Sequence, residues 1–300
     1  MENKQKEPLK IVTEIDRQSI HLAHSHYENF PVASIFLPEH YRKPIALIYN
    51  FARQADDFAD EGDLTIEHRL SLLNDFRNEL DLIQAYIKPK TALFHALGLM
   101  IKERNLPLKP FYDLLDAFSQ DVTKTRYADY DDVLDYCTRS ANPIGLLLLH
   151  LYGEASEHNI ALSNNICTAL QLINFLQDIA VDFNKNDGKQ RIYMSQDELS
   201  AFGISEQRLK NHVNLTQAAD DHWQQFMHFN LRRAHALLLA GKPLGHRLKG
   251  RIGFEMRLIV AGGERIIYKI SQINGDIFSH RPKINYWDWT VIFLKALFKQ

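Results

Sequence analysis

The segment between residues 166 and 183 constrains this chain most. It is apolar on nearly every side of a predicted helix, and Asn174, Asp178 and Asp182 interrupt it at steps of four. Residues four apart share a helix face, so these polar side chains form one stripe on a helix that should be buried almost all round. Buried carboxylates are costly unless they are paired or bind a metal. The pattern favours a metal site, and a solvated stripe on a surface helix is the alternative.

Helical periodicity dominates the rest of the chain, and alternating strand patterns are scarce, which predicts an all-α fold. Only 13 Gly and 10 Pro interrupt 300 residues, which leaves room for long helices. A single domain over residues 1–300 is the simplest organisation. The predicted helices are 14–25, 39–60, 65–87, 91–104, 109–125, 130–151, 156–184, 195–210, 214–240, 244–274 and 286–299.

Composition argues against several classes of protein. The net charge is −2 and the pI is about 6.7, whereas a nucleic-acid binder needs a concentrated basic surface. Cys137 and Cys167 have no metal-type spacing, which suits a reducing cytosol. Residues 1–10 are too polar for a signal peptide, and no uncharged run approaches the roughly 20 residues of a membrane span. We therefore expect a cytoplasmic protein that does not bind nucleic acid.

The last segment is rich in large apolar side chains. It is too short to cross a bilayer, so it either packs on the body of the protein or makes peripheral contact with the inner membrane surface. The basic residues Arg247, Lys249 and Arg251 fit either a solvated face or contact with anionic lipid. The apolar residues are Tyr286, Trp287, Trp289, Val291, Ile292, Phe293, Leu294, Leu297 and Phe298.

A second acidic stripe lies near residue 57. Asp56, Asp57 and Asp60 share a broad face of a predicted helix with Arg53. Like charges at this spacing repel, Asp is a mediocre helix former, and acidic residues at a helix C-terminus oppose the macrodipole. A sequence that accepts these costs indicates a function for the carboxylates, and a solvated acidic helix end is the alternative.

The two Asp-x-x-x-Asp pairs, Asp56/Asp60 and Asp178/Asp182, make a stronger case together. Mg²⁺ prefers oxygen ligands and takes few of them from protein, with water and substrate phosphate completing its shell. Two carboxylate helices facing each other across a cavity would hold such ions and a diphosphate, and the metal would neutralise the leaving group as its C–O bond ionises. The chain has no Gly-rich phosphate loop, so we expect Mg²⁺ as the cofactor.

In order, spacing and flanking residues, these motifs resemble the squalene/phytoene synthase family over most of the chain. The resemblance implies an isoprenoid-synthase helical bundle around a central apolar cavity, in which the four Asp residues bridge Mg²⁺ to diphosphate and Asn174 assists them. The residues that carry the resemblance are Tyr49, Arg53, Asp56, Asp57, Asp60, Tyr136, Cys137, Gly145, Gln171, Asn174, Asp178, Asp182, Arg191, Ile192 and Tyr193.

The resemblance also implies which residues contact the substrate. Arg53, Arg191 and Tyr193 support the diphosphate, while Tyr49 and Gln171 line the cavity. The substrate-binding set is Tyr49, Arg53, Tyr136, Asn142, Gln171, Arg191 and Tyr193. The substrate tail is long and apolar, so apolar side chains should form the rest of the lining. We expect these to include Phe30, Ile35, Phe36, Leu146, Leu147, Leu172 and Phe175.

Five stretches resemble one branch of the family: 28–34, 55–62, 140–145, 174–178 and 260–263. That branch converts presqualene diphosphate and water into hydroxysqualene and diphosphate in bacterial hopanoid biosynthesis, without NADPH. In a carbocation mechanism the protein supplies shape, charge stabilisation and a placed water. The polar candidates for holding that water, each of which is alternatively a hydrogen-bonded core amide, are Asn142, Gln171 and Asn174.

Departures from the wider family bear on the choice of reaction. The small hydroxyl residues usual in the N-terminal substrate segment are replaced around Tyr27 and Asn29, Gln177 stands where Arg is common, and Asn142-Pro143 interrupts a middle helix that is usually Gly-rich. Fewer hydroxyls and less positive charge near phosphate weaken the case for condensing two diphosphates.

Two other functions stay open. A condensing transferase of the same fold would join two farnesyl diphosphates into presqualene diphosphate, squalene or phytoene. A non-catalytic helical assembly or lipid carrier is the third hypothesis, against which both intact Asp pairs argue. The expected partners are presqualene or farnesyl diphosphate, together with pathway enzymes.

Overall fold

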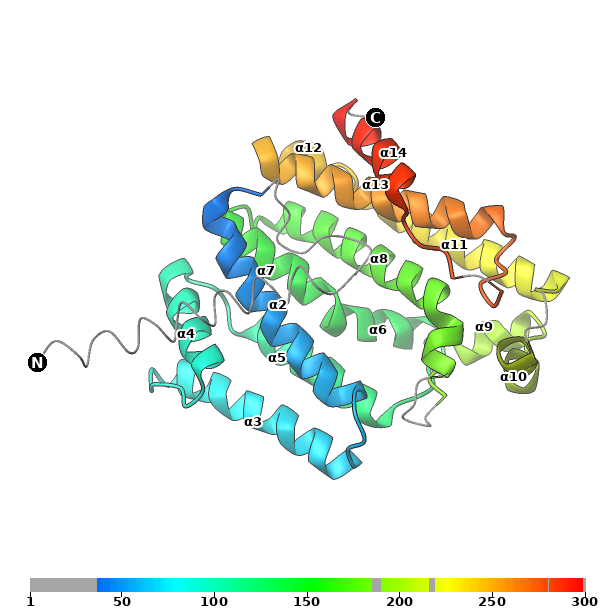
Figure 1. Cartoon of the computed structure of the whole chain (residues 1–300). Helices are drawn as coiled ribbons and strands as arrows, with labels where there is room; N and C mark the ends of the chain where they lie inside the picture. Colours follow the sequence, from blue (N-terminus) through cyan, green and yellow to red (C-terminus); the bar gives the residue numbers. More distant parts are fainter. Residues whose placement is uncertain (1–36, 185–189, 216–218, 280, 299–300) are drawn as a thin grey trace, which may run out of the picture. The chain divides into compact units, whose positions relative to one another are not determined.

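The computed structural model describes residues 37–184, 190–215, 219–279 and 281–298. All regular secondary structure within these ranges is helical, which confirms the all-α prediction (Figure 1). Strand-type pairing among them is limited to an isolated bridge between Tyr127 and Ser195. The helix predicted at 14–25, and the candidate residues Tyr27, Asn29, Phe30, Ile35 and Phe36, lie outside the described residues.

The chain divides into two compact units. Unit 1 takes its described residues from 37–122 and 143–156, and unit 2 takes its described residues from 123–142 and 157–298. The helices of unit 1 are α2 (Glu39–Asp60), α3 (Ile66–Gln84), α4 (Ala92–Arg104), α5 (Lys109–Thr123) and α7 (Asn142–Tyr152). Those of unit 2 are α6 (Tyr130–Ser140), α8 (Glu157–Phe183), α9 (Gln196–Ala201), α10 (Glu206–Leu215), α11 (Asp221–Gly241), α12 (Leu244–Arg247), α13 (Gly250–Gln272) and α14 (Tyr286–Leu297). That the whole chain acts as one domain stays a prediction.

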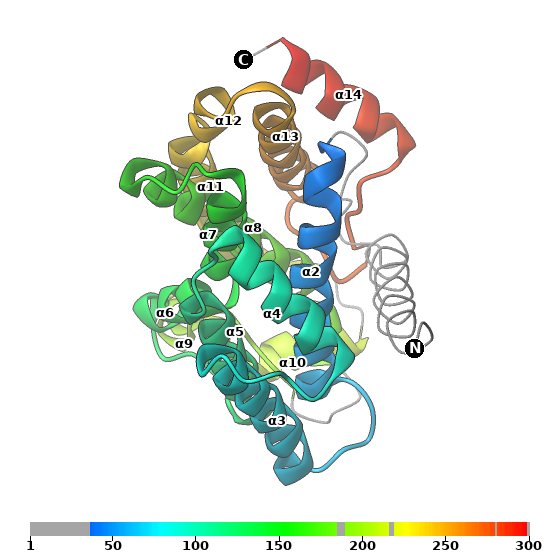
Figure 2. The same ribbon diagram turned by 90° about the vertical axis from the view of Figure 1, so that its left-hand side faces the viewer.

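An aromatic cluster forms the centre of unit 1. Phe51 of α2 is fully buried, and its ring centroid lies 5.7 Å from Phe76 of α3, 5.8 Å from Phe94 of α4 and 5.2 Å from Phe111 of α5. Offset and edge-on ring pairs of this kind add to the gain from burying the apolar surface. One side chain therefore joins four helices, of which α2, α3 and α4 lie side by side (Figures 1 and 2).

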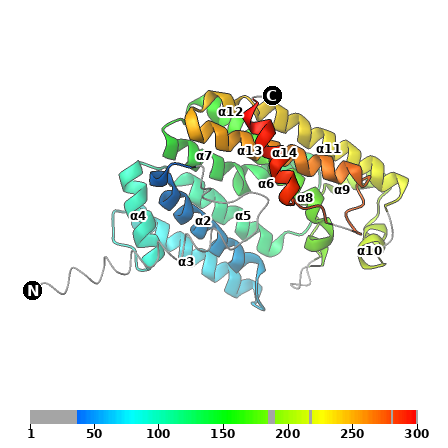
Figure 3. The same ribbon diagram turned by 45° about the horizontal axis from the view of Figure 1, so that its top comes forward.

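Unit 2 is built around α8, which packs along α11 and also contacts α13 (Figures 1 and 3). Close approach of α11 to α8 depends on Gly241, where a Cβ atom would meet Ile166 Cγ1 at 2.5 Å and the Leu162 carbonyl at 2.7 Å. At the other end of α11, buried Trp223 donates from its indole nitrogen to the Gly275 carbonyl at 3.0 Å. Helix α14 packs across α13.

Several helix boundaries agree with the predictions. The helix predicted at 39–60 is α2 itself, and 65–87, 91–104, 109–125, 156–184 and 286–299 differ from the observed helices by three residues or fewer at each end. Thr65 caps α3 by accepting a hydrogen bond from the His68 backbone N–H, and Asp129 caps α6 by accepting one from Asp132 N–H. Both caps satisfy donors that a helix start leaves unpaired.

The single helix predicted at 130–151 is wrong, because two helices, α6 and α7, occupy this segment. The break falls at Ala141, directly before Asn142 and Pro143. A proline has no N–H to continue the preceding helix and its ring clashes with the carbonyl four residues back, whereas near a helix start no N–H is needed. Pro143 therefore ends α6 and starts α7.

Three other helices were predicted too long. The segment 195–210 is divided into α9 and α10 between Ala201 and Glu206, where Gly203 has a φ of +69° that glycine adopts without strain. The segment 244–274 is divided into α12 and α13 at Gly250, with φ of +60°. The helix predicted to begin at 214 is α11, which begins at Asp221 because Asp220 caps it through the Trp223 N–H at 3.0 Å.

Helix α8 is the one described helix that is long and apolar enough to cross a membrane by length and composition alone. More than half of its most apolar window is buried inside the protein, and α11 packs along it. These contacts are typical of a core helix.

Candidate active site

The last two turns of α2 carry the first predicted site. Ala55 and Ala59 are buried in the core of unit 1, which leaves Asp56, Asp57 and Asp60 half-buried on the opposite side of the helix. One oxygen from each of the three carboxylates lies within 4.8 Å of the others. Such a cluster suits Mg²⁺, which takes a few carboxylate oxygens and fills its remaining positions with water and phosphate. All three belong to the predicted acidic stripe, on which Asp56 and Asp60 were the predicted metal ligands, and the structure brings the Asp57 carboxylate into the same cluster.

Arg53 lies at the edge of this cluster. Its Nη1 is 3.2 Å from Asp56 Oδ2 and its Nη2 is 2.7 Å from Asp57 Oδ1. Burial alone would lower the pKa of Arg53, but the nearby Asp56 and Asp57 carboxylates, with Tyr49 and Asp60, more than offset burial and raise it. Arg53 therefore stays cationic beside the acidic stripe, and its predicted contact with diphosphate stays a prediction.

A second arginine, which the sequence analysis missed, completes the end of α2. Arg69 of α3 is 3% exposed and donates to the carbonyls of Phe58, Glu61, Gly62 and Leu64 at 2.7 to 3.2 Å. The last carbonyls of a helix have no partner within the helix and carry partial negative charge. The Arg69 guanidinium satisfies carbonyls in and just beyond the last turn of α2, and it offsets the charge that the acidic stripe adds there.

The second Asp pair lies on the more open side of α8. Asn174 is exposed, and Asp178 and Asp182 are half-buried. Val181 beside them is also exposed. The expectation that this helix is buried almost all round is therefore wrong for the stripe that carries the carboxylates. The carboxylates can meet a ligand without the cost of complete desolvation.

Asp178 makes an ion pair that the sequence did not reveal. Arg281, in the segment before α14, binds its carboxylate with two nitrogens, Nε to Oδ1 and Nη2 to Oδ2, the second at 3.0 Å. The neighbouring Gln177 is 1% exposed, and its side-chain amide donates to the Pro282 carbonyl. The Gln177 amide thus fixes the segment that carries Arg281. The partners are 103 residues apart in sequence, so no local pattern signals the contact.

The two Asp pairs belong to different units, Asp56 and Asp60 to unit 1 and Asp178 and Asp182 to unit 2. Each unit presents its carboxylates on a half-buried helix face. That the two pairs face each other across a shared diphosphate stays a prediction.

Three predicted substrate residues meet in an aromatic cluster of unit 2. Tyr193 stacks on Phe175 with 4.1 Å between ring centroids, and Tyr136 lies 5.5 Å from Tyr193 and 5.5 Å from Tyr127. Buried Arg191 places Nη1 3.3 Å from the Tyr193 hydroxyl. Aromatic faces attract cations, and the Arg191 guanidinium carbon lies 5.8 Å from the centre of the Tyr193 ring.

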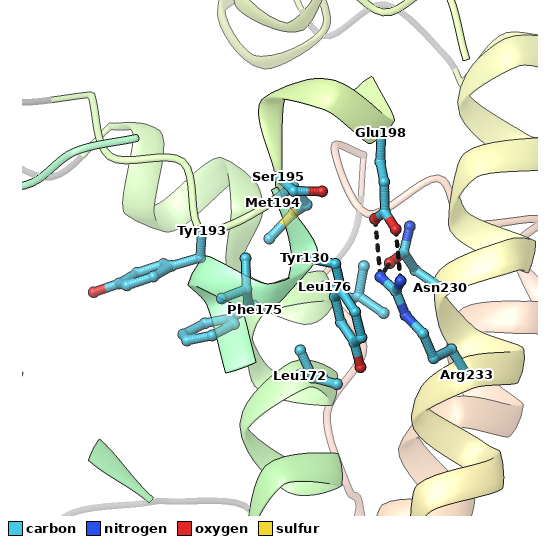
Figure 4. A pocket seen from close by; sticks show the side chains of 11 residues that line it. Tyr130, Leu172, Phe175, Leu176, Tyr193, Met194, Ser195, Glu198, Asn230 and Arg233 are labelled. Carbon is cyan, nitrogen blue, oxygen red and sulfur yellow. Dashed lines mark hydrogen bonds and ion pairs between the residues drawn. The ribbon is translucent and has the colours of Figure 1, made fainter. Parts of the chain in front are cut away.

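A small pocket adjoins this cluster (Figure 4). Its polar wall is Arg233 of α11, whose Cζ lies 3.3 Å from the ring centroid of Tyr130. Arg233 also contacts Glu198 Oε1 at 2.5 Å and Asn230 Oδ1 at 2.6 Å. Sequence reasoning missed Glu198, Asn230 and Arg233, because Glu198 of α9 meets the two α11 residues only in the folded protein. The full lining is Tyr130, Val133, Leu172, Phe175, Leu176, Tyr193, Met194, Ser195, Glu198, Asn230 and Arg233.

The remaining candidates divide between the site and the core. Leu172 and Phe175 line the pocket as expected. Leu147 does not line a cavity, because it is fully buried in the hydrophobic core of unit 1. Asn142 accepts a hydrogen bond from the Thr168 hydroxyl at 3.1 Å, so one of its polar atoms is already used within the protein. Tyr49, Leu146 and Gln171 are half-buried, and their predicted places in the lining of the cavity stay predictions.

Comparison with known sequences identifies the family. The family model described as squalene/phytoene synthase matches residues 23–288. A hydroxysqualene synthase of Rhodopseudomonas palustris is 35% identical over 241 residues, which span 80% of this chain and 78% of the relative. A second hydroxysqualene synthase, from Sinorhizobium fredii, is 34% identical with the same coverage.

Solved structures agree with this assignment. Squalene synthase HpnC from Alicyclobacillus acidocaldarius is similar with a TM-score of 0.77 and 32% identity, covering 88% of this chain and 95% of that one. A dehydrosqualene synthase with bound ligand has the same fold, with a TM-score of 0.81 at 17% identity over 97% of this chain and 98% of its own. The protein therefore belongs to the squalene/phytoene synthase family.

Proposed function

We propose that this protein converts presqualene diphosphate and water into hydroxysqualene and diphosphate, as a Mg²⁺-dependent carbon–oxygen lyase of squalene and hopanoid biosynthesis. The family acts on prenyl diphosphates such as farnesyl and presqualene diphosphate. The observation that carries the proposal is the carboxylate cluster of Asp56, Asp57 and Asp60, whose oxygens lie within 4.8 Å of one another. The similarity to hydroxysqualene synthases supports the particular reaction.

Asp56, Asp60, Asp178 and Asp182 would hold the metal, whose chemistry is to neutralise charge on the departing diphosphate. Arg53 lies beside the first of these carboxylates and Arg281 beside the third. Guanidinium groups bind phosphate oxygens through paired hydrogen bonds. Both arginines can therefore exchange a carboxylate partner for diphosphate without leaving the site.

The reaction then proceeds on the hydrocarbon. The C–O bond to diphosphate breaks and its electrons leave with the diphosphate. The cyclopropylcarbinyl cation rearranges, and a water oxygen bonds to the new cationic carbon, after which the proton passes to solvent or diphosphate. The π faces of Phe175 and Tyr193 suit the cation, and Asn174, Gln171 and Asn142 are the candidates for orienting the water.

A condensing farnesyltransferase is the alternative. The chain is 30% identical over 190 residues to a presqualene diphosphate synthase of Sinorhizobium fredii, which covers 61% of this chain. Against this alternative, Gln177 is buried and its amide is used on Pro282, so α8 offers no guanidinium at that position for a second diphosphate.

One assay separates the two reactions. Purified protein with Mg²⁺ is given farnesyl diphosphate alone or presqualene diphosphate alone, without NADPH, and the products are identified by mass spectrometry. We expect hydroxysqualene from presqualene diphosphate only, with ¹⁸O incorporated from labelled water. Presqualene diphosphate formed from farnesyl diphosphate would establish the condensing reaction instead.

We also propose a cytoplasmic location with peripheral contact at the inner membrane surface. Substrate and product each carry a C30 hydrocarbon, which partitions into lipid. Enzymes that supply presqualene diphosphate or consume hydroxysqualene would then meet this enzyme at the same surface.

A further inference from the structure

The helix α14 differs from an ordinary surface helix in which of its side chains are buried and which are exposed. The side chains that face α13 include a carboxylate, Asp288, together with Ile292 and Ala296, and all three are buried. A surface helix normally turns its apolar stripe toward the core and its polar residues toward water. In α14 the charged Asp288 points inward beside Ile292 and Ala296, and most of the large apolar side chains lie on the other side of the helix.

The solvent-facing side of α14 is almost wholly apolar. Trp287, Val291, Leu294 and Phe298 follow one another at helical spacing, and Tyr286, Phe293 and Leu297 form a second row beside them. These seven side chains form the outer face of α14. Tyr286 is 82% exposed, Trp287 76% and Phe298 72%. Contiguous apolar surface of this kind marks a site of contact with a membrane or another protein.

Polar contacts hold α14 firmly, so its outer face is a fixed surface. Asp288 is bound by Arg265 at 2.6 Å and Lys269 at 2.5 Å, both from α13. At the other end of the helix, Arg257 donates to the Ala296 carbonyl at 2.8 Å. Asn285 and Asp288 also form a reciprocal cap at the N-terminus of α14.

The exposed charges in the sequence around the outer face have one sign, although Lys295 also pairs with the half-buried Glu264 at 3.3 Å. Between residues 249 and 298 the described charged side chains that are exposed are all basic: Lys249, Arg251, Lys283 and Lys295. The acidic side chains of this segment are buried or half-buried. Phe254, three residues after Arg251, has its ring 5.5 Å from Phe293, so the basic start of α13 lies beside α14. The segment has eight basic and four acidic residues, although the whole chain has a net charge of −2.

We propose that the outer face of α14 docks on a membrane surface that contains anionic lipid. Trp and Tyr favour the headgroup level, apolar side chains enter the acyl boundary, and basic side chains attract anionic headgroups. A second copy of the chain fits less well, because a symmetric contact would bring the basic residues of both copies together. This inference deepens the proposed location at a membrane and is independent of the reaction.

Vesicle flotation with the full-length protein tests the inference. Wild-type protein is mixed with phosphatidylcholine vesicles or with vesicles that also contain phosphatidylglycerol, at low and at high salt. We expect binding to the anionic vesicles and weaker binding at high salt, because salt screens the basic residues. The combined substitution Trp287→Ser, Leu294→Ser and Phe298→Ser should weaken binding at least 100-fold, since it removes much of the inserted apolar area.

A matched control uses exposed apolar residues of unit 1. The combined substitution Tyr86→Ser, Ile87→Ser and Leu99→Ser removes three exposed apolar side chains far along the sequence from α14 and should leave vesicle binding unchanged. Circular dichroism and turnover in detergent check that each variant folds. Absence of turnover by a wild type that binds the vesicles would count against the proposed reaction and leave docking intact. Absence of vesicle binding by the wild type, or equal binding by both triple variants, overturns the inference. So does a change of oligomeric state in the α14 variant without a change in vesicle binding.

Discussion

Asp56 and Asp178 are the first residues of their motifs, yet their surroundings differ. Asp56 lies among other carboxylates, and Asp178 binds Arg281 with both oxygens. Asp56→Asn and Asp178→Asn each remove one anionic ligand, so we expect kcat/KM for presqualene diphosphate to fall at least about 100-fold. The Mg²⁺ concentration needed for half-maximal rate should rise in both. Rates measured across a magnesium titration check this.

The control for these variants is Asp75→Asn, which changes an exposed carboxylate on α3. It should keep the activity and magnesium dependence of the wild type. Full activity in both Asp56→Asn and Asp178→Asn would contradict the two-motif account.

Arg281 offers a second test at this scale. Arg281→Gln removes the two-nitrogen contact with Asp178, and we expect kcat/KM to fall about tenfold or more, because charge-assisted paired hydrogen bonds are among the strong ones. Arg281→Lys keeps the charge without the planar fork, so it should be intermediate. Arg77→Gln, which breaks an exposed ion pair with Asp116, is the matched control and should have no effect. Equal activity of all three variants would show that Arg281 only supports structure.

The residues that sequence reasoning found and those it missed differ in the range of their contacts. The acidic stripe of Asp56, Asp57 and Asp60 repeats within one helix, so spacing alone predicts it. Arg281 and Arg233 reach their partners from other elements, 103 and 35 residues away in sequence. Helical periodicity carries no information about such contacts.

At the scale of elements, helices were predicted well where the end signals in the sequence were recognised. They were predicted too long where a proline or glycine that ends a helix was overlooked. α2 ends before Glu61 and Gly62, and its prediction was confirmed. Apolar periodicity continues through Pro143 and Gly250, which hid two breaks. Backbone geometry at a proline or at a positive φ overrides side-chain periodicity in such places.

The attachment of α14 should depend on pH through Asp288. Burial would raise the pKa of this carboxyl, but Lys269, the Asn285 N–H and Arg265 together hold it below its ordinary value of 3.8. The stabilisation of the folded state by the Asp288 carboxylate is therefore complete well above pH 3.8. It is lost as the pH falls through the lower pKa that Asp288 has in the folded state. We expect fluorescence of the α14 tryptophans to report loosening below pH 3.8 and not at pH 6.

Asp288→Asn gives the corresponding loss at neutral pH. Breaking a buried ion pair from one side costs about 3–5 kcal/mol, and urea denaturation at pH 7 measures it. This variant should also lose the step in stability below pH 3.8, while Asp75→Asn should keep it. An unchanged free energy of unfolding would show that Arg265 and Lys269 do not hold the helix.

At the scale of the whole molecule, the two motifs belong to separate units. If both bind one metal–diphosphate group, then Mg²⁺ with inorganic pyrophosphate at 100 times the Kd should stabilise the protein by about 2.7 kcal/mol. Calorimetry should show a rise in Tm of several degrees, reversed by a chelator. Asp56→Asn and Asp178→Asn should each abolish the rise. Stabilisation that survives Asp178→Asn would mean that unit 1 binds the group alone.

The path of the chain through the two units affects how the protein can be synthesised. The chain leaves unit 1 after residue 122, returns at 143 and leaves again after 156. Leu147 and Leu151 from the returning segment are buried in the core that α2 to α5 begin. The ribosome must therefore have translated past residue 156 before the core of unit 1 can be completed. By then residues 123–142, which belong to unit 2, have already been synthesised. A nonsense mutation at residue 143 would remove Leu147 and Leu151 and leave that core incomplete and prone to aggregation. Because each unit is built from two segments of the chain, neither unit is encoded by one continuous stretch of the gene.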